Sequence, residues 1–209
     1  MIILAHKGYW LNKNEQNSLN AFKTAFSLGF GIETDIRDYN GEIVISHDIP
    51  DKNCIKLEQV FSAYKKFQQD LPLALNIKSN GLQDKLKKSL EKYKIKNYFV
   101  FDMSVPDALT YYKGNCVFFT RKSEYEEVPS FYSQAKGVWM DEFVSHWINE
   151  KLVSKCVKDG KKICIVSPEL HQRNYKKEWP EYKKLEQHLK VQLMICTDHP
   201  EKARWFFNA

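Results

Sequence analysis

The chain has 209 residues and a formal net charge of +6, with 43% hydrophobic and 28% charged residues. These values are typical of a water-soluble globular protein, and we expect one compact domain over residues 1–209. No stretch approaches the roughly 20 apolar residues that a membrane-spanning helix needs. The N-terminal segment MIILAHKG also lacks the basic start of a signal peptide. We therefore expect a cytoplasmic protein without a membrane span.

The positive charge and the cysteines predict neither a nucleic-acid partner nor a zinc site. The lysines are scattered over helix-like segments such as DKLKKSLEKYKIK, which is typical of a solvated helix face rather than of a basic binding module. The five cysteines are an odd number and include no C-x-x-C motif. We expect free thiols rather than a disulfide framework.

Short apolar runs alternate with amphipathic segments along the chain. The first such segment, residues 18–30, places Leu19, Phe22 and Phe26 on one stripe, and Gly29 can end that helix. Eight runs predict strands: IILAH (2–6), GIETDI (31–36), LPLALNIK (71–78), NYFVFDMS (97–104), CVFFTR (116–121), GVWMDEF (137–143), KICIVSP (162–168) and VQLMICTD (191–198).

Strands that alternate with helices predict a parallel α/β sheet, and eight such units fit a compact (β/α)8 barrel of the TIM type. The segment GEIVISHD (41–48) would be an extra strand in the loop after the second strand. The alternative is a doubly wound open sheet, but no glycine-rich phosphate loop follows the first strand.

Polar side chains stand at the carboxyl end of nearly every predicted strand, where a parallel barrel builds its active site. Helix capping or loop hydrogen bonding is the simpler interpretation for several of these acids. The residues at the later strand ends are Asp102, Arg121, Asp141, Glu142, Glu169, His171 and Asp198.

Glu33 and Asp35 are harder to explain without a ligand. They lie two apart on one predicted strand, so both side chains point to the same face, about 7 Å apart along the strand. Two such charges repel unless something positive lies between them. A hard cation such as Mg²⁺ or Ca²⁺ would suit, and an ion pair with Lys7, Lys78 or Arg37 is the equal alternative.

Two histidines flank these acids. His6 ends the first strand and His47 follows the second. One imidazole can accept a proton from a nucleophile while the other protonates a leaving oxygen. Together with a carboxylate-bound cation and a lysine, they form a constellation suited to cleaving a phosphodiester.

The sequence resembles the glycerophosphodiester phosphodiesterase family, within the phospholipase-C-like phosphodiesterase superfamily of TIM barrels. That family has His-Arg-Gly, Pro-Glu-Asn-Thr, Glu-x-Asp, Asp-Gly followed by His-Asp, then Glu-x-Lys and Thr-Asp-x-Pro. The corresponding segments here, in the same order, are HKG (6–8), EQNSLNAF (15–22), ETD (33–35), NGEIVISHD (40–48), NIK (76–78) and TDHP (197–200).

The resemblance implies that His6 and His47 are the acid/base pair of a phosphoric diester hydrolase. It implies that Glu33, Asp35 and Asn76 hold the divalent metal, Mg²⁺ or Ca²⁺. Lys7 and Lys78 would contact the phosphate of a small phosphodiester substrate, and a substrate hydroxyl next to the phosphate is a candidate attacking group. Further pocket candidates are Gln16, Asn17, Arg121, Asp141 and Glu169.

The chain departs from the family pattern at three positions. Lys7 replaces arginine and keeps the charge without the bidentate fork. Gln16 and Asn76 each replace a glutamate, which removes two negative charges. We therefore expect weaker metal binding than in the family. Asp102, Asp141 or Glu169 is a candidate source of the missing charge.

Three functions are compared. A metal-assisted phosphodiesterase acting on a glycerophosphodiester or similar molecule accounts for the complete His/acid/His set. The alternative is a non-catalytic barrel that binds a sugar- or glycerol-phosphate, which the changes at Gln16 and Asn76 would favour. A nucleic-acid binder lacks a recognisable module. The sequence specifies neither the alcohol group of the substrate nor the oligomeric state.

Overall fold

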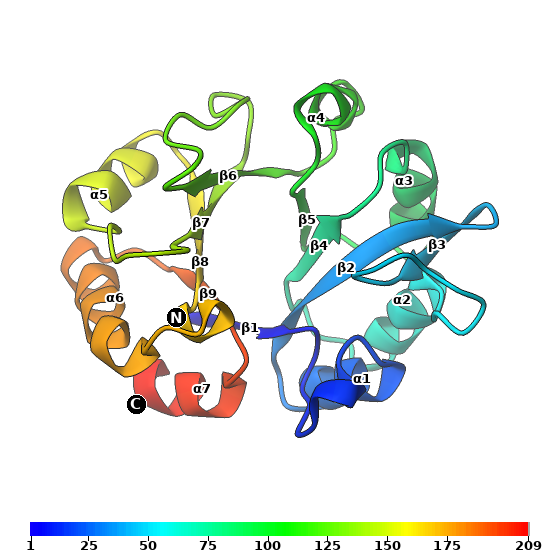
Figure 1. Cartoon of the computed structure of the whole chain (residues 1–209), viewed down its shortest axis with the longest axis horizontal. Helices are drawn as coiled ribbons and strands as arrows, with labels where there is room; N and C mark the ends of the chain where they lie inside the picture. Colours follow the sequence, from blue (N-terminus) through cyan, green and yellow to red (C-terminus); the bar gives the residue numbers. More distant parts are fainter. Residues whose placement is uncertain (209) are drawn as a thin grey trace. The chain divides into compact units, whose positions relative to one another are not determined.

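The computed structural model describes residues 1–208 (Figure 1). The strands are β1 (Ile2–His6), β2 (Gly31–Tyr39), β3 (Glu42–Ile45), β4 (Leu73–Ile77), β5 (Tyr98–Phe101), β6 (Phe119–Ser123), β7 (Gly137–Asp141), β8 (Lys162–Val166) and β9 (Met194–Thr197). The α-helices are α1 (Leu19–Ser27), α2 (Leu57–Lys66), α3 (Gln83–Lys92), α4 (Val105–Lys113), α5 (Glu150–Lys158), α6 (Tyr175–Leu189) and α7 (Pro200–Asn208). Two short 3-10 helices are η1 (Lys13–Glu15) and η2 (Pro168–His171).

The strand order confirms the predicted fold class. The sheet runs β5-β4-β2-β1-β9-β8-β7-β6, and β3 pairs with β2 beside this path. Strand pairs on both sides of this order, such as β2 with β4 and β7 with β8, are parallel. This is the strand arrangement of a (β/α)8 barrel. The segment predicted as an extra strand is β3, which forms an antiparallel hairpin with β2.

The chain divides into two compact units, which we describe separately. Unit 2 comprises residues 5–118, and unit 1 comprises residues 1–4 together with residues 119–209. The first strand contributes to both units, because its residues up to Leu4 group with the C-terminal part of the chain.

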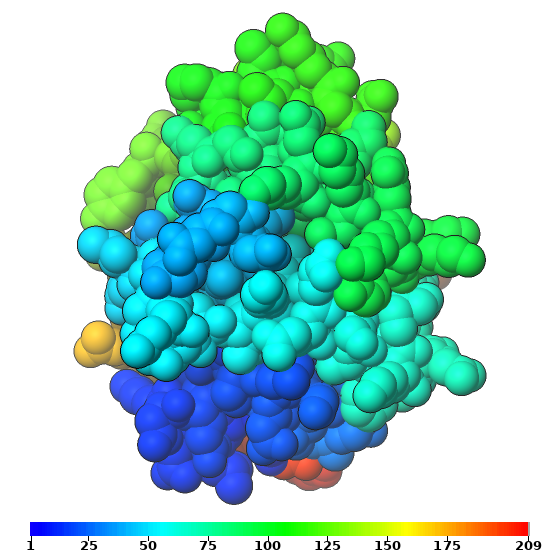
Figure 2. All heavy atoms as spheres, turned by 90° about the vertical axis from the view of Figure 1, so that its right-hand side faces the viewer, coloured from blue at the N-terminus to red at the C-terminus, as the bar shows by residue number. Residues whose placement is uncertain are grey.

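Unit 2 contains the long strand β2, which is buried from Gly31 to Ile36. Helix α1 begins at the cap Ser18, whose hydroxyl accepts from the Ala21 amide, 3.1 Å away. The helix buries Phe22 and Phe26, as its spacing predicted. Gly29 follows the helix with a φ of +77°, a conformation that glycine adopts without strain. Figure 2 shows the blue-to-green segments of this unit as a packed surface.

Unit 1 departs from the prediction between two strands. Residues 124–136, between β6 and β7, form turns, bends and one isolated bridge of Glu126 with Ser123, whereas a complete (β/α)8 pattern would place a helix there. The loop packs back through Tyr132, whose hydroxyl donates to Asp159 (2.8 Å) beside α5. Strand β6 also begins at Phe119, three residues later than predicted. Helices α5 and α6 lie side by side in this unit (Figure 1).

All five cysteines are free, as predicted. None of the helices within residues 1–208 combines the length and apolar content that crossing a membrane would require.

Candidate functional site

Strand β2 buries two carboxylates on one face. Glu33 is 2% exposed and Asp35 is 1% exposed, and the intervening Thr34 points to the other side of the strand. The flanking isoleucines, Ile32 and Ile36, are fully buried and favour the extended conformation. The strand therefore holds both acids in the interior of unit 2, where an unpaired charge is costly.

Three neighbouring segments are tied to β2 beside these acids. The Lys7 amide donates to the Glu33 carbonyl (2.9 Å), and the Ser46 amide donates to the Asp35 carbonyl (3.1 Å). On the other side, Asn76 of β4 lies opposite Asp35 in the parallel register. Lys7, Ser46 and Asn76 therefore lie beside the Glu33–Asp35 segment of β2.

Cationic side chains surround the pair. Lys78 Nζ lies 3.4 Å from Asp35 Oδ1, and Lys7 Nζ lies 3.8 Å from Asp35 Oδ2. His6 Nε2 lies 3.8 Å from Glu33 Oε2. The ion-pair alternative is therefore realised at Asp35, which has two lysines within 4 Å, while Glu33 has the imidazole of His6 at 3.8 Å.

The different surroundings of the two acids affect the pKa of Glu33. Burial raises the pKa of Glu33 to about 7, and the negative charge of Asp35 adds to the rise. The positive groups His6, Lys7 and Lys78 oppose it. The positive groups of the fold therefore do not offset the burial of Glu33, and a cationic ligand would stabilise its charged form.

Two of the three residues predicted to hold a metal have a buried oxygen that accepts no hydrogen bond from residues 1–208. Glu33 Oε2 and Asn76 Oδ1 are buried, and neither has a hydrogen-bond partner among residues 1–208. Buried polar oxygens are normally paired, so this pair calls for an explanation. Carboxylate and amide oxygens are ligands of Mg²⁺ and Ca²⁺. The donor set Glu33, Asp35 and Asn76 therefore fits a hard divalent cation, with less negative charge than three carboxylates would supply.

His47 follows β3 and remains accessible. Its side chain is 54% exposed, and its Nδ1 lies 2.9 Å from Asp48 Oδ1. This contact with His47 lowers the pKa of Asp48, to which the charges of Lys7 and Arg37 also contribute. A proton on Nδ1 leaves the Nε2 lone pair to accept another proton. The Arg37 Nε–H donates to the His47 carbonyl (3.2 Å) and ties this loop to β2.

The loop after β1 supplies a further contact to Asp35. The Asn17 side-chain amide donates to Asp35 Oδ2 (3.0 Å), and its oxygen accepts from Thr34 (2.8 Å). At Gly8, φ is +88° and an added Cβ would lie 2.9 Å from Ala21, so this turn requires glycine. Gln16, the other pocket candidate here, is half-buried at the end of η1.

The remaining pocket candidates belong to unit 1, and each is engaged there. Arg121 of β6 forms an ion pair with Glu126. Asp141, at the end of β7, lies 2.6 Å from His171 Nε2. Glu169 accepts from the hydroxyls of Ser167 and Thr197 and from the Asp198 amide.

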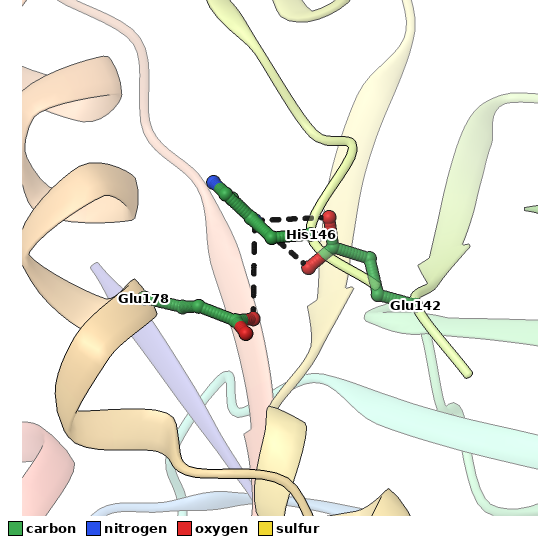
Figure 3. A group of neighbouring side chains, drawn as sticks. All are labelled: Glu142, His146 and Glu178. Atoms are coloured by element: carbon green, nitrogen blue, oxygen red, sulfur yellow. Dashed lines mark hydrogen bonds and ion pairs between the residues drawn. The ribbon is translucent and has the colours of Figure 1, made fainter. Parts of the chain in front are cut away.

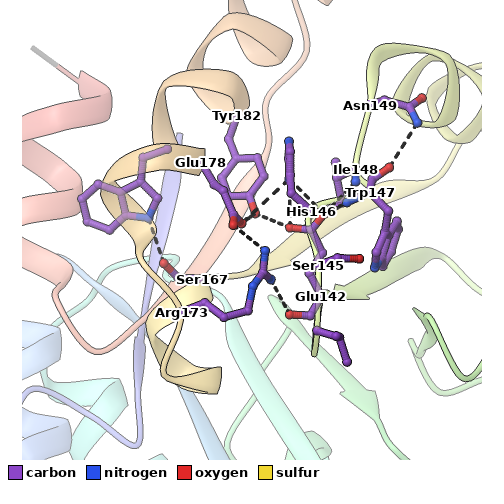
Figure 4. A network of polar contacts seen from close by, with 12 residues as sticks. Glu142, Ser145, His146, Trp147, Ile148, Asn149, Ser167, Arg173, Glu178 and Tyr182 are labelled. Atoms are coloured by element: carbon purple, nitrogen blue, oxygen red, sulfur yellow. Dashed lines mark hydrogen bonds and ion pairs between the residues drawn. The ribbon is translucent and has the colours of Figure 1, made fainter.

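Unit 1 also holds a cluster of two acids and a histidine, of which only Glu142 is buried. Glu142, His146 and Glu178 each place a potential ligand atom within 4.8 Å of the others (Figure 3). The cluster belongs to a larger network with Arg173 and Tyr182 (Figure 4).

Donors already occupy the carboxylates of this network. Glu142 is fully buried and accepts from the backbone amides of Trp147 and Ile148 (2.5 and 2.7 Å) and from the Tyr182 hydroxyl (2.5 Å). Glu178 pairs with the Arg173 guanidinium, and burial raises the pKa of the Tyr182 phenol. The network resembles a structural clamp on the loop after β7 more than a vacant metal site, because each acid already has strong donors.

Sequence reasoning missed three of these contacts. It named Asn17 only as a pocket residue, placed Arg37 among possible partners of the acids, and gave no role to Arg173. The side chain of Arg37 reaches a backbone carbonyl ten residues away, which no motif records.

Comparisons with known proteins support the fold. No protein-family model matches the sequence, and no curated protein matches it either. Among solved structures, a phosphodiesterase of Oleispira antarctica in complex with the product sn-glycerol-3-phosphate is 14% identical, with a TM-score of 0.67 over 100% of this chain and 97% of that chain. A glycerophosphoryl diester phosphodiesterase of Parabacteroides distasonis is 14% identical, with a TM-score of 0.68 over 99% of this chain and 86% of that one.

A third structure is more distant. A Ca²⁺-dependent phosphatidylinositol-specific phospholipase C of Streptomyces antibioticus is 9% identical, with a TM-score of 0.55 over 99% of this chain and 95% of that chain. The predicted resemblance to phospholipase-C-like TIM barrels is therefore confirmed in the fold. Because a fold of this kind carries many activities, the function has to be argued from the site.

Proposed function

We propose that the chain is a phosphoric diester hydrolase that acts on a glycerophosphodiester or a similar small diester. The observation that supports this most strongly is the convergence on Glu33 and Asp35 of two histidine-bearing loops and two lysines. The likeness to phosphodiesterase structures is consistent with this reading but concerns the fold alone.

In the proposed reaction, one imidazole of the pair His6 and His47 takes the proton of the attacking water, or of a hydroxyl next to the phosphate in a substrate that has one. A P–O bond forms to that oxygen, and the P–O bond to the alcohol breaks. The other imidazole gives a proton to the departing alkoxide, so no free alkoxide is released. Asp48 suits the role of orienting His47, because its carboxylate lies 2.9 Å from Nδ1 and leaves Nε2 for proton transfer.

The lysines would bind the substrate phosphate. Lys7 and Lys78 each lie within 4 Å of Asp35, so their ammonium groups are held at the level of the acids. Their charges offset that of a phosphodiester in a partly buried site, where electrostatic interactions are stronger than in water. A divalent cation held by Glu33, Asp35 and Asn76 would add Lewis-acid stabilisation of the phosphate.

The test is hydrolysis of bis(p-nitrophenyl) phosphate with Mg²⁺, with Ca²⁺ and with a chelator. Wild type should turn over, and His47→Ala should lower the rate by about 100-fold or more. The matched control is His188→Ala, because His188 is 73% exposed and pairs with Glu150 on the helix surface. Equal rates in the two variants would remove His47 from the mechanism.

A second candidate function is phosphate binding without catalysis. It is favoured by Asn76 in place of a third acid and by the two lysines that already neutralise Asp35. In that case glycerol 3-phosphate should raise the melting temperature in the presence of chelator, and no diester should be cleaved. Metal-dependent turnover that disappears in His47→Ala would exclude this alternative.

A further inference from the structure

A groove in unit 1 lies where the barrel pattern lacks a helix. Residues 124–136, between β6 and β7, form no helix, and this loop runs beside α5 (Figure 1). Between the loop and α5 is a groove of about 960 Å³. The helices of this fold form a ring around the barrel, so the missing helix leaves one side of α5 uncovered. A groove of this volume can hold several side chains.

The groove has two walls on different elements. The loop wall is formed by residues 122–128, and the helix wall is formed by residues 149–159, which include α5. Lys122 Nζ donates to the Glu127 carbonyl (2.6 Å) and fixes the loop wall. The Asn149 side chain caps the start of α5 by accepting from a backbone amide (3.1 Å). Both walls are therefore ordered before any partner binds.

Most charges near the walls are already paired within the chain. The Glu124 carboxylate accepts from the backbone amides of three residues in the next loop, each 3.0 Å away. Glu126 forms an ion pair with Arg121, and Lys155 Nζ lies 2.8 Å from Asp159 Oδ2. These groups hold unit 1 together and leave little charge for a partner.

Three exposed charges on the walls have no such partner. Within residues 1–208, Glu127 on the loop wall and Lys151 and Lys158 on the helix wall form no ion pair. The two lysines lie two helical turns apart, so they share one side of α5. The walls therefore carry free charges of opposite sign that do not neutralise each other within one copy of the chain.

Apolar side chains are exposed beside these charges. Tyr125 and Val128 of the loop wall are 76% and 90% exposed. Val144, which is 65% exposed, donates its amide to Glu124 of the same wall. Among the described residues of unit 1, the one other large hydrophobic side chain with such exposure is Trp205 on α7. A cluster of exposed apolar groups next to unmatched charges is typical of a protein interface.

We propose that this groove is the interface of a symmetric dimer, in which the loop wall of each copy packs against the helix wall of the other. A two-fold axis brings Glu127 of one copy to Lys151 and Lys158 of its partner, and the same contact forms a second time. A second copy suits the groove because the occupant must present an acidic side and a basic side, and this chain offers both. The dimer does not depend on the proposed hydrolase function.

The first experiment is sedimentation velocity from about 1 to about 500 μM protein, at about 50 and about 500 mM salt. Wild type should form a reversible dimer that is weaker at high salt, because exposed ion pairs are screened. Tyr125→Ser with Val128→Ser should weaken the dimer about tenfold or more, because these side chains no longer leave water. Trp205→Ser is the matched control: this residue is 77% exposed on α7, and its loss should leave the dimer unchanged.

The second experiment exchanges the charges of the two walls. Glu127→Lys alone, and Lys151→Glu with Lys158→Glu alone, should each weaken the dimer about tenfold, because like charges then meet. Mixed in equal amounts, the two variants should form a heterodimer, because every contact again joins opposite charges. Lys176→Glu with Lys177→Glu, on the exposed side of α6, makes the same change in net charge. This control should dimerise like wild type and should not pair preferentially with Glu127→Lys.

Three results would overturn the proposal. A monomer at every concentration would leave the groove to a partner of different sequence. A dimer that the groove variants leave intact would place the interface elsewhere on the chain. Failure of the two charge variants to associate when mixed would exclude the two-fold pairing of the walls. Regained association in the mixture cannot come from an unfolded chain, so the outcome does not depend on small losses of stability in the variants.

Discussion

Two groups of buried carboxylates in this chain have opposite surroundings. Glu142 in unit 1 accepts from two backbone amides and a tyrosine hydroxyl, so its charge is satisfied by the fold. Among the described residues, 1–208, Glu33 in unit 2 keeps one buried oxygen without a hydrogen bond, and so does its neighbour Asn76. The potential ligand atoms of Glu142, His146 and Glu178 lie within 4.8 Å of one another, yet it is the second group that has buried oxygens without a hydrogen bond among residues 1–208. The hydrogen bonds that each carboxylate accepts, rather than the proximity of the acids, therefore distinguish a structural clamp from a binding site.

The largest effect should come from exchanging a histidine in each region. His6→Ala should lower diester turnover by about 100-fold to 10,000-fold, because a proton-transfer group is lost. His146→Ala, its control in the unit 1 network, should leave turnover close to that of wild type. The rates of the two purified variants on bis(p-nitrophenyl) phosphate check this, and a similar loss in both would erase the functional difference between the regions.

Neutralising Glu142 should lower the stability of the fold. Glu142→Gln replaces one acceptor oxygen with an amide that faces donors, and it leaves the Tyr182 hydroxyl or a backbone amide without its partner. We expect the free energy of unfolding to fall by about 2–4 kcal/mol. Urea unfolding followed by circular dichroism measures this change. A loss below about 0.5 kcal/mol would mean that water or a neighbour replaces the contact.

Neutralising Glu33 should have the opposite effect on stability to neutralising Glu142. The pKa of Glu33 is raised from 4.5 to about 7 in the folded chain, so between these values the folded state binds the extra proton. Stability without metal should therefore fall as pH rises from about 4.5 to 7 and then level off, with a total change of about 3 kcal/mol at most. Glu33→Gln should remove that slope and be the more stable protein at pH 8. Unfolding curves at pH 5 and pH 8 in chelator test the sign, and an unchanged slope would contradict the assignment.

The smallest effect concerns the missing acid. Asn76→Glu should tighten Mg²⁺ or Ca²⁺ binding by about tenfold, because a charged ligand replaces a neutral one. The same change should lower stability in chelator, since it adds a third buried carboxylate. Titration calorimetry and the metal-induced shift of melting temperature report the two effects. Asn20→Glu, on the exposed side of α1, is the matched control and should change neither. Unaltered affinity in Asn76→Glu would place the cation elsewhere.

Much of the fold could be predicted because its periodicities are local. Buried strands such as β2 and β8 are short apolar runs, and α1 has its apolar residues at helical spacing. The absent helix between β6 and β7 could not be recognised in this way. Its segment has polar and apolar residues in helix-like proportions, but Pro129 interrupts it. Tyr132 is also drawn to Asp159 and to the ammonium groups of Lys155 and Lys161.

The candidate site was predictable only where short motifs carry it. Such motifs contain His6, Glu33, Asp35 and His47. The structure places His6 beside Glu33 of β2 and ties the His47 backbone to the same strand through Arg37. By contrast, Tyr182 reaches Glu142 from 40 residues away, and Arg173 reaches its carbonyl from 31 residues away. No local pattern encodes these pairings, because they depend on how strands and helices come together in the folded chain.

The divided first strand has a consequence for how the chain folds. Ile2 donates its amide to the carbonyl of Leu193 (2.8 Å), and both residues belong to unit 1. During synthesis the N-terminal residues therefore cannot form these hydrogen bonds until Leu193, just before β9, has been made. This is a contact of very high sequence separation. Residues 5–118, in contrast, are complete once the ribosome has passed the middle of the chain. The unit that carries the proposed acid/base histidines, His6 and His47, can form early, while the other unit closes only after Leu193 has been made.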